Sequence, residues 1–202
     1  MEKLILASAS PRRAKLLQQI RIDFEQIVSG IEDERTETTD PGEHVLLLSK
    51  RKAKNVIRET SERWILGADT IVVLDGCIMG KPCEGASAFH MLRRLNGRDH
   101  TVFTGLTLFD THRERELSQY EATRVWIRHL SDGEIEDYVA SSEPLGKAGG
   151  YAIQGLGATL VEKIEGCYYN VVGLPLVRLL TMMRDMDFPF RLRINSGERE
   201  IP

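Results

Sequence analysis

The segment LILASASPRR, residues 4–13, joins an apolar run to a short loop and the start of a helix. Ser10 is a favourable N-cap residue, and Pro11 suits the first helical position. Backbone N–H groups are unpaired at such a helix start, and the guanidiniums of Arg12 and Arg13 can bind phosphate oxygens beside them. The segment therefore predicts a strand, a tight turn and a phosphate-binding helix N-terminus. An ordinary strand-to-helix connection with surface arginines is the alternative, and this segment alone does not exclude it.

The orientation of Arg13 favours the binding interpretation. Helical spacing places Arg13 on the same side as Leu17 and Ile20, so its side chain is expected to point into the protein. A solvated basic face would not need that orientation.

Helices and strands alternate along the rest of the chain. Strands are expected at residues 4–7, 24–28, 64–74, 101–109 and 120–129. Helices are expected at residues 11–20, 42–60, 84–95, 131–140 and 176–186. The hairpin partner at 120–129 implies a mixed, twisted sheet with flanking helices, an α/β fold. Residues 1–187 are expected to form one domain, and residues 188–202 a loosely ordered tail.

Composition narrows the class of protein. At 202 residues, with 42% hydrophobic and 28% charged residues, the chain has the composition of a soluble globular protein. Its net charge of −3 argues against a nucleic-acid binder, which needs a basic excess. Three scattered cysteines favour a reducing cytoplasm over a disulfide framework or a zinc site. No signal peptide or membrane-spanning run is apparent, so we expect a cytoplasmic protein that binds neither membrane nor nucleic acid.

Asp69 is the charged residue of the apolar run ILGADTIVVL, residues 65–74. Burying an unpaired carboxylate costs several kcal/mol, so Asp69 should meet a cation, a metal or hydrogen-bond donors. A structural ion pair or turn cap is the alternative. We favour function, because such carboxylates are common at functional sites.

Two lysines are candidates to accompany Asp69. The expected helix at 42–60 carries five basic residues, four of which fit a solvated face. Lys52 does not, because it lies at helical spacing from Val45, Leu48 and Val56 on the buried side. Lys81, in the GKP loop after the predicted hairpin at 74–77, should lie near the same strand, although it is weak evidence alone.

Other polar segments are less specific. Glu32, Asp33 and Glu34 can supply oxygen ligands to Mg²⁺, although acidic loops are more often simply solvated. The glycine-rich segments at 146–151 and 155–157 match neither a dinucleotide-binding motif nor a P-loop, and tight turns near a ligand explain them. The five histidines are isolated, which favours structural roles and gives no sign of covalent catalysis.

Six ordered motifs resemble the Maf family of nucleotide pyrophosphatases. The resemblance covers residues 3 to about 186, in SASPRR, GADT, GKP, LNGRDHTVFTG, GKAGGYAIQG and GCYYNVVGLPL. It implies a fold related to inosine triphosphate pyrophosphatases, with two lobes around a cleft, a divalent metal (Mg²⁺ or Mn²⁺) and a homodimer.

The resemblance also implies roles for individual residues. Arg12, Thr70 and Gln154 match the subgroup that hydrolyses dTTP and UTP, and would influence base choice. In family terms Asp69 is the proton acceptor, and the polar cleft contains Ser8, Arg13, Lys52 and Lys81. Asp69 and Asp33 would hold the metal. Asp33 stands where the family commonly has Glu, and its shorter side chain could alter metal geometry. The chain also departs from the usual family residues at Asn96, Gly150 and Ala152, none of which is a proposed metal position.

The expected reaction is hydrolysis of a pyrimidine nucleoside triphosphate to monophosphate and pyrophosphate. Water would attack the α-phosphorus without a covalent intermediate, while Arg13, Lys52 and Lys81 offset the developing charge. Two alternatives stay open: a nucleotide-binding regulator of cell division, and cleavage of 7-methyl-GTP.

Overall fold

The computed structural model describes residues 3–31 and 36–190. The strands are β1 (Leu4–Ala7), β2 (Phe24–Gln26), β3 (Trp64–Leu74), β4 (Cys77–Met79), β5 (Asp99–Asp110), β6 (Arg115–Ile127) and β7 (Val161–Glu165). The α-helices are α1 (Pro11–Gln19), α2 (Pro41–Ile57), α3 (Gly85–Leu95), α4 (Asp132–Ala140), α5 (Tyr168–Val172) and α6 (Leu176–Asp185). Two 3₁₀ helices are η1 (Ala148–Gly150) and η2 (Gly155–Thr159).

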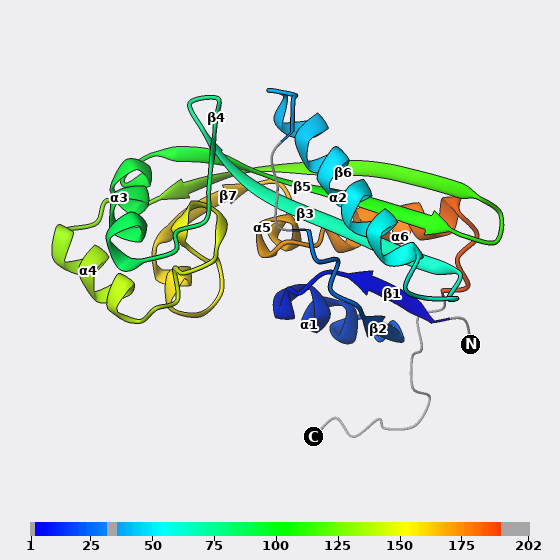
Figure 1. Ribbon diagram of the computed structural model, residues 1–202. Helices are drawn as coiled ribbons and strands as arrows, with labels where there is room; N and C mark the ends of the chain where they lie inside the picture. The colour runs from blue at the N-terminus through cyan, green and yellow to red at the C-terminus, as the bar shows by residue number, and fades with distance from the viewer. Residues whose placement is uncertain (1–2, 32–35, 191–202) are drawn as a thin grey trace, which may run out of the picture.

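The described strands form one mixed sheet. Their order is β2-β1-β3-β5-β6-β7, with β4 also paired to β3. The β2, β1 and β3 strands are parallel, and the pairs from β3 through β5 and β6 to β7 are antiparallel. This arrangement confirms the predicted fold class. The long strands β3, β5 and β6 extend through both halves of the molecule (Figure 1).

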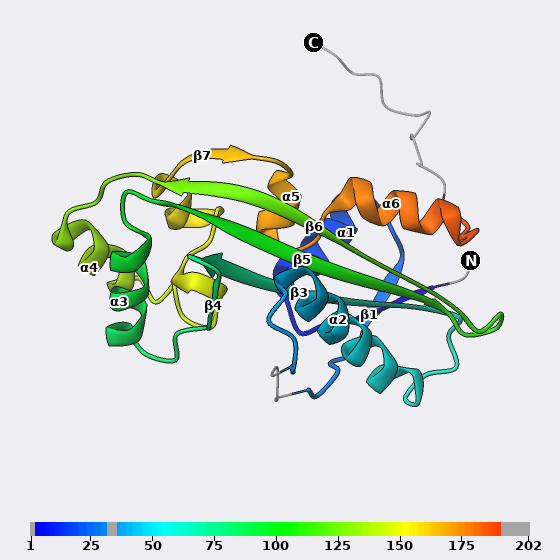
Figure 2. The same cartoon turned by 90° about the horizontal axis from the view of Figure 1, so that it is seen from above.

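The first lobe packs helices on both faces of the sheet. Helix α2 covers one face, and α1 and α6 cover the other (Figures 1 and 2). Within β1, Leu4 and Leu6 belong to the core beneath α1 and α6, whereas Ile5 and Ala7 belong to the core beneath α2. Because both faces of β1 are covered, it is apolar at every position.

The second lobe surrounds the far ends of the long strands. It consists of β4, α3, α4, β7 and the two 3₁₀ helices (Figure 1). Its hydrophobic core, distinct from that of the first lobe, includes Val72, Leu92, Val125 and Ile135. The predicted capping box is present at the start of α4, where Ser131 and Glu134 satisfy each other's backbone N–H groups.

Several local expectations need correction. Strand β6 begins at Arg115, earlier than predicted, and α2 ends at Ile57 before the predicted position 60. Strand β7 and helix α5 were not predicted, because β7 is an edge strand with half-buried or exposed residues and α5 has only five residues. Beyond the end of α6, Phe188 packs edge-on against Trp64 with ring centroids 5.2 Å apart. The expectation of a loosely ordered segment at 188–202 stays a prediction.

One edge of β3 has an opening in its middle. Along that edge β1 pairs with residues 64–67 of β3, and β4 pairs with residues 72–74. Between them, residues 68–71 have no described strand paired along this edge, while β5 pairs with them along the other edge. Asp69 and Thr70 lie in this interval, and Ser8 follows directly after β1. The fold therefore brings the predicted site residues to a gap in the sheet.

Candidate active site

A cleft of about 560 Å³ lies at this gap. The turn from β1 to α1, the middle of β3, the GKP loop and the glycine-rich segment before η2 line it, together with the end of α5. Eight residues singled out from the sequence line this cleft: Ser8, Arg12, Arg13, Lys52, Asp69, Thr70, Lys81 and Gln154. The ninth, Asp33, lies outside the described residues. The structure thus brings the eight together, while their individual roles stay predictions.

Asp69 and Lys52 form a buried ion pair. Lys52 Nζ lies 2.5 Å from Asp69 Oδ1, and the two side chains are 10% and 3% exposed. Lys52 is therefore on the buried side of α2, as its helical spacing predicted. The other oxygen of Asp69, Oδ2, is buried and has no hydrogen-bond partner within the described part of the chain. A buried carboxylate oxygen left in this state is available to a ligand.

The close approach of α2 to β3 makes this ion pair possible. Gly67 lies two residues before Asp69, on the same face of β3. A Cβ atom at Gly67 would lie 2.0 Å from the carbonyl oxygen of Ser49 and 2.9 Å from the Ala53 side chain. Any larger residue would therefore push α2 outward and take Lys52 away from Asp69.

Arg13 ties three parts of the cleft wall together. Its Nε donates to the carbonyl oxygen of Gly173 at 2.8 Å, and Nη1 donates to Ser8 Oγ at 2.8 Å. Nη2 donates to Thr70 Oγ1 at 2.9 Å. The inward orientation predicted for Arg13 is confirmed, since the residue is buried. These contacts position Ser8 and Thr70 in the cleft wall, a role that spacing alone did not indicate.

A chain of hydroxyl groups continues from Thr70 across the sheet. Thr70 Oγ1 and Thr104 Oγ1 are 2.9 Å apart, and Thr104 Oγ1 donates to the carbonyl oxygen of Asn170 at 3.0 Å. The side chain of Asn170 in turn donates to Thr123 Oγ1 at 2.9 Å. Thr70 is thus held by Thr104 of β5 as well as by Arg13, and Thr104 is in turn held by α5.

The other wall of the cleft carries more cationic groups. Arg12 is half-buried, and burial lowers the pKa of its guanidinium, opposed by Tyr138 and Glu143. Lys147 also lines the cleft, and both burial and the nearby charge of Arg12 lower the pKa of its ammonium. Lys81 and Gln154 are exposed residues of the same lining.

Sequence reasoning missed the part played by Lys147 and its neighbours. The GKAGGY segment was interpreted only as tight turns, yet it places Lys147 in the cleft. Tyr151, from the same segment, is buried and contacts His100, with 2.6 Å between Tyr151 Oη and His100 Nε2. The lysine among the glycines was the available signal. Nothing local marked His100, whose partner lies 51 residues away.

Sequence comparisons relate this chain to one protein family and to proteins within it. The family described as Maf-like protein matches residues 3–186. A dTTP/UTP pyrophosphatase of Caldicellulosiruptor bescii is 46% identical over 192 residues, covering 93% of this chain and 96% of that protein. Another dTTP/UTP pyrophosphatase, from Thermoanaerobacter pseudethanolicus, is 47% identical over 191 residues, covering 94% and 99%.

Among solved structures, a HAM1 protein from Coxiella burnetii aligns with a TM-score of 0.45 at 12% identity, covering 80% of this chain and 81% of that one. The family match spans nearly the whole chain and includes every described residue that lines the cleft. The chain belongs to the Maf family.

Proposed function

We propose that this protein hydrolyses dTTP and UTP to the nucleoside monophosphate and pyrophosphate. Two relatives that align over nearly their whole length are dTTP/UTP pyrophosphatases. The observation that carries the proposal is the buried Asp69 carboxylate, which is paired with Lys52 through one oxygen only. The other described charged residues that line its cleft are all cationic. A triphosphate is the kind of ligand that such a lining attracts.

The cationic groups lie on several elements around the cleft. Arg12 comes from the start of α1, Lys52 from α2, Lys81 from the loop after β4, and Lys147 from the segment before η1. Distributed charges of this kind can contact several phosphate groups and stabilise a departing pyrophosphate. In this proposal Lys52 also positions Asp69, while Arg13 holds Ser8 and Thr70 in the wall.

A divalent cation, Mg²⁺ or Mn²⁺, fits the residues present. No group of three or more histidine, cysteine or acidic residues is clustered in the portions of the chain described, at 3–31 and 36–190. Asp69 Oδ2 nevertheless offers one unpartnered carboxylate oxygen. Mg²⁺ at phosphate-transfer sites commonly uses one or two carboxylates and completes its shell with substrate phosphates and water. Asp69, together with Asp33, would hold the cation, which would polarise the phosphate oxygens.

Asp69 is also the proposed proton acceptor for the attacking water. A base must lie within hydrogen-bond reach of the proton that it removes, and Asp69 Oδ2 has acceptor capacity to spare. Lys52 restricts the carboxylate by its bond to Oδ1. Arg12, Thr70 and Gln154 are the proposed base-selecting residues, because they line the same cleft from α1, β3 and the segment before η2.

A nucleotide panel tests the proposal. The wild-type protein is incubated with dTTP, UTP, CTP, ATP, GTP and 7-methyl-GTP plus Mg²⁺ in water labelled with heavy oxygen. We expect pyrophosphate release to be fastest with dTTP and UTP, and the label to enter the monophosphate, since the α-phosphorus is attacked. Label in the pyrophosphate, or tight binding with negligible turnover, would contradict the proposal.

Three further expectations remain predictions: a homodimer, a cytoplasmic location, and a single domain over residues 1–187 followed by a loosely ordered segment. In the described part of the chain, no helix combines the length and apolar character needed to cross a membrane. Size-exclusion chromatography with light scattering would test the dimer.

A further inference from the structure

The segment at residues 152–157 carries Gln154 into the cleft, and one pair of side chains holds both of its ends. Glu143 lies just after α4, and Tyr138 lies within that helix. Glu143 Oε2 accepts a hydrogen bond from the N–H of Leu156 at 3.0 Å, and Oε1 accepts one from the N–H of Gly157 at 2.9 Å. These contacts fix the end of the segment that follows Gln154.

Tyr138 fixes the other end. Its hydroxyl donates to Glu143 Oε1 at 2.9 Å and accepts from the N–H of Ala152 at 3.2 Å. The hydroxyl of Tyr138 and the carboxylate of Glu143 therefore form a continuous bridge from Ala152 to Gly157. We call Glu143 and Tyr138 the loop clamp.

The backbone is shaped to receive the clamp. Gly155 has a φ of +67°, and a Cβ atom there would lie 2.5 Å from Glu143 Oε2. Glycine at this position therefore lets the carboxylate reach the two N–H groups beyond it. Burial alone would raise the pKa of the Glu143 carboxyl, but the N–H groups of Gly157 and Leu156 and the Tyr138 hydroxyl hold it below its usual value. The clamp carboxylate is thus stabilised in its charged form.

Glu143 also lies close to two cations of the cleft, Arg12 and Lys147. The ammonium of Lys147 donates to the carbonyl oxygen of Glu143. Glu143 also interacts electrostatically with Arg12 and with Lys147. Glu143 therefore joins the segment that carries Gln154 to the part of the wall that presents Arg12 and Lys147.

We propose that the loop clamp of Glu143 and Tyr138 sets the position of Gln154 and thereby the preference for uracil and thymine over cytosine. This inference rests on the proposed function. A glutamine amide offers both hydrogen-bond donors and an acceptor, and these meet the edge of a base only if the backbone that carries the side chain is held at the right place. Neither clamp residue lines the cleft, which makes both of them positioning residues.

The clamp is separate from the proposed catalytic pair. Asp69 and Lys52 lie on β3 and α2 in the first lobe, whereas Glu143 and Tyr138 hold the loop of the second lobe. The hydrogen bonds of the clamp join Tyr138 and Glu143 to Ala152, Leu156 and Gly157, whereas Lys52 donates to Asp69. Loosening the clamp should therefore change base preference and KM more than kcat.

Glu143→Gln and Tyr138→Phe test the inference. The Gln amide nitrogen cannot accept from the Leu156 N–H, and Phe removes the link to Ala152. In each variant we expect the ratio of kcat/KM for UTP to that for CTP to fall by about tenfold, with kcat for UTP within about threefold of wild type. The double variant should lose little more than either single variant, because both act through one bridge. Glu136→Gln, an exposed change on the same helix, should leave the ratio unchanged.

The outcomes separate this inference from the proposed function. If wild type releases pyrophosphate with a preference for UTP, and both clamp variants keep that preference, the clamp inference is wrong and the function stands. A loss of kcat at unchanged preference would likewise overturn it. If wild type cleaves no triphosphate, the proposed function fails and takes the inference with it.

Discussion

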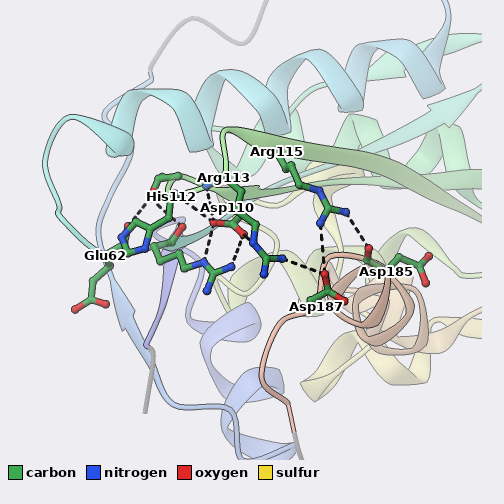
Figure 3. Close-up of polar contacts among 9 residues, drawn as sticks. Glu62, Asp110, His112, Arg113, Arg115, Asp185 and Asp187 are labelled. Carbon is green, nitrogen blue, oxygen red and sulfur yellow. Dashed lines mark hydrogen bonds and ion pairs between the residues drawn. The ribbon is translucent and has the colours of Figure 1, made fainter.

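Asp69 and Asp110 are both buried aspartates on adjacent long strands of the same sheet, yet their surroundings differ completely. Asp110, at the end of β5, accepts from Arg63 Nε at 2.7 Å and from Arg63 Nη2 at 2.6 Å. It also accepts from the N–H groups of His112 and Arg113, both at 3.2 Å (Figure 3). Asp69 has its contact with Lys52, and its second oxygen has no partner among the described residues.

The difference shows that burial and ion pairing do not by themselves mark a functional carboxylate. Both oxygens of Asp110 accept hydrogen bonds from protein donors, so Asp110 fastens the β5–β6 hairpin to Arg63. Asp69 retains acceptor capacity and lines the cleft. His100 adds a third case: its Nδ1 is also buried without a described partner, but the residue does not line that cleft. A spare acceptor has functional meaning where a substrate can reach it.

Replacing Asp69 should give the largest effect on activity. Asp69→Asn keeps the size of the side chain but removes the charge and the basic oxygen, so kcat for UTP should fall by about a thousandfold or more. Pyrophosphate release measures it, on protein shown to be folded by circular dichroism. Asp75→Asn, an exposed change at the end of the same strand, is the matched control. Turnover within tenfold of wild type would remove Asp69 from the chemistry.

Replacing Asp110 should affect stability instead. Asp110→Asn leaves the partly buried Arg63 without its counter-charge, so the free energy of unfolding should fall by about 4 kcal/mol. Urea denaturation measures this change, and kcat of the folded variant should match wild type. Asp99→Asn, at the exposed start of β5, is the comparison variant and should lose far less. A stable but inactive Asp110→Asn protein would break the contrast between the two aspartates.

The stability of the protein should fall with decreasing pH over two separate pH ranges, the first set by His100 and the second by Asp110. Burial lowers the pKa of His100 from 6.5 to about 4, partly opposed by Asp99, so the unfolded chain binds a proton first as the pH falls. Stability should therefore decrease between pH 6.5 and about 4, by about 3 kcal/mol in all. The hydrogen bonds from Arg63 lower the pKa of Asp110 from 3.8 to about 2, so its contribution is lost only below pH 3.8.

His100→Gln checks the first window. The variant should show a flatter stability profile between pH 6.5 and about 4 in urea titrations, while the exposed change His90→Gln should keep the wild-type slope. A wild-type slope in His100→Gln would show that this histidine is not the group responsible.

The exposed ion pairs around Asp110 should give the smallest effect. Arg113 Nη1 and Arg115 Nη1 lie 3.0 and 3.5 Å from Asp187 Oδ2, and all three side chains are exposed (Figure 3). Arg115→Ala should therefore cost less than about 1 kcal/mol, and the cost should shrink in high salt. Urea denaturation at two salt concentrations measures it. If Arg115→Ala lowers the free energy of unfolding as much as Asp110→Asn does, then solvent exposure does not explain the difference between the ion pairs of Asp187 and Asp110.

Much of the site could be predicted because its signals are local. A lone acid in an apolar strand, a lysine on the apolar side of a helix and an inward arginine each conflict with the pattern around them, and that conflict is visible in a few residues. Glu143 and His100 gave no such signal. Their partners lie up to 14 and 51 residues away along the chain, and neither residue interrupts an apolar pattern.

The sequence by itself determined the alternation of helices and strands and the family. It also determined that Asp69, Lys52 and Arg13 are buried. These features follow from hydrophobic periodicity and short motifs, which are properties of neighbouring residues. Only the tertiary structure decided which carboxylate oxygen is left without a partner. It also decided that Arg13 binds the cleft wall and that Glu143 holds the loop of Gln154. Hydrogen bonds between distant segments depend on how the sheet and helices pack, and no local pattern encodes that packing.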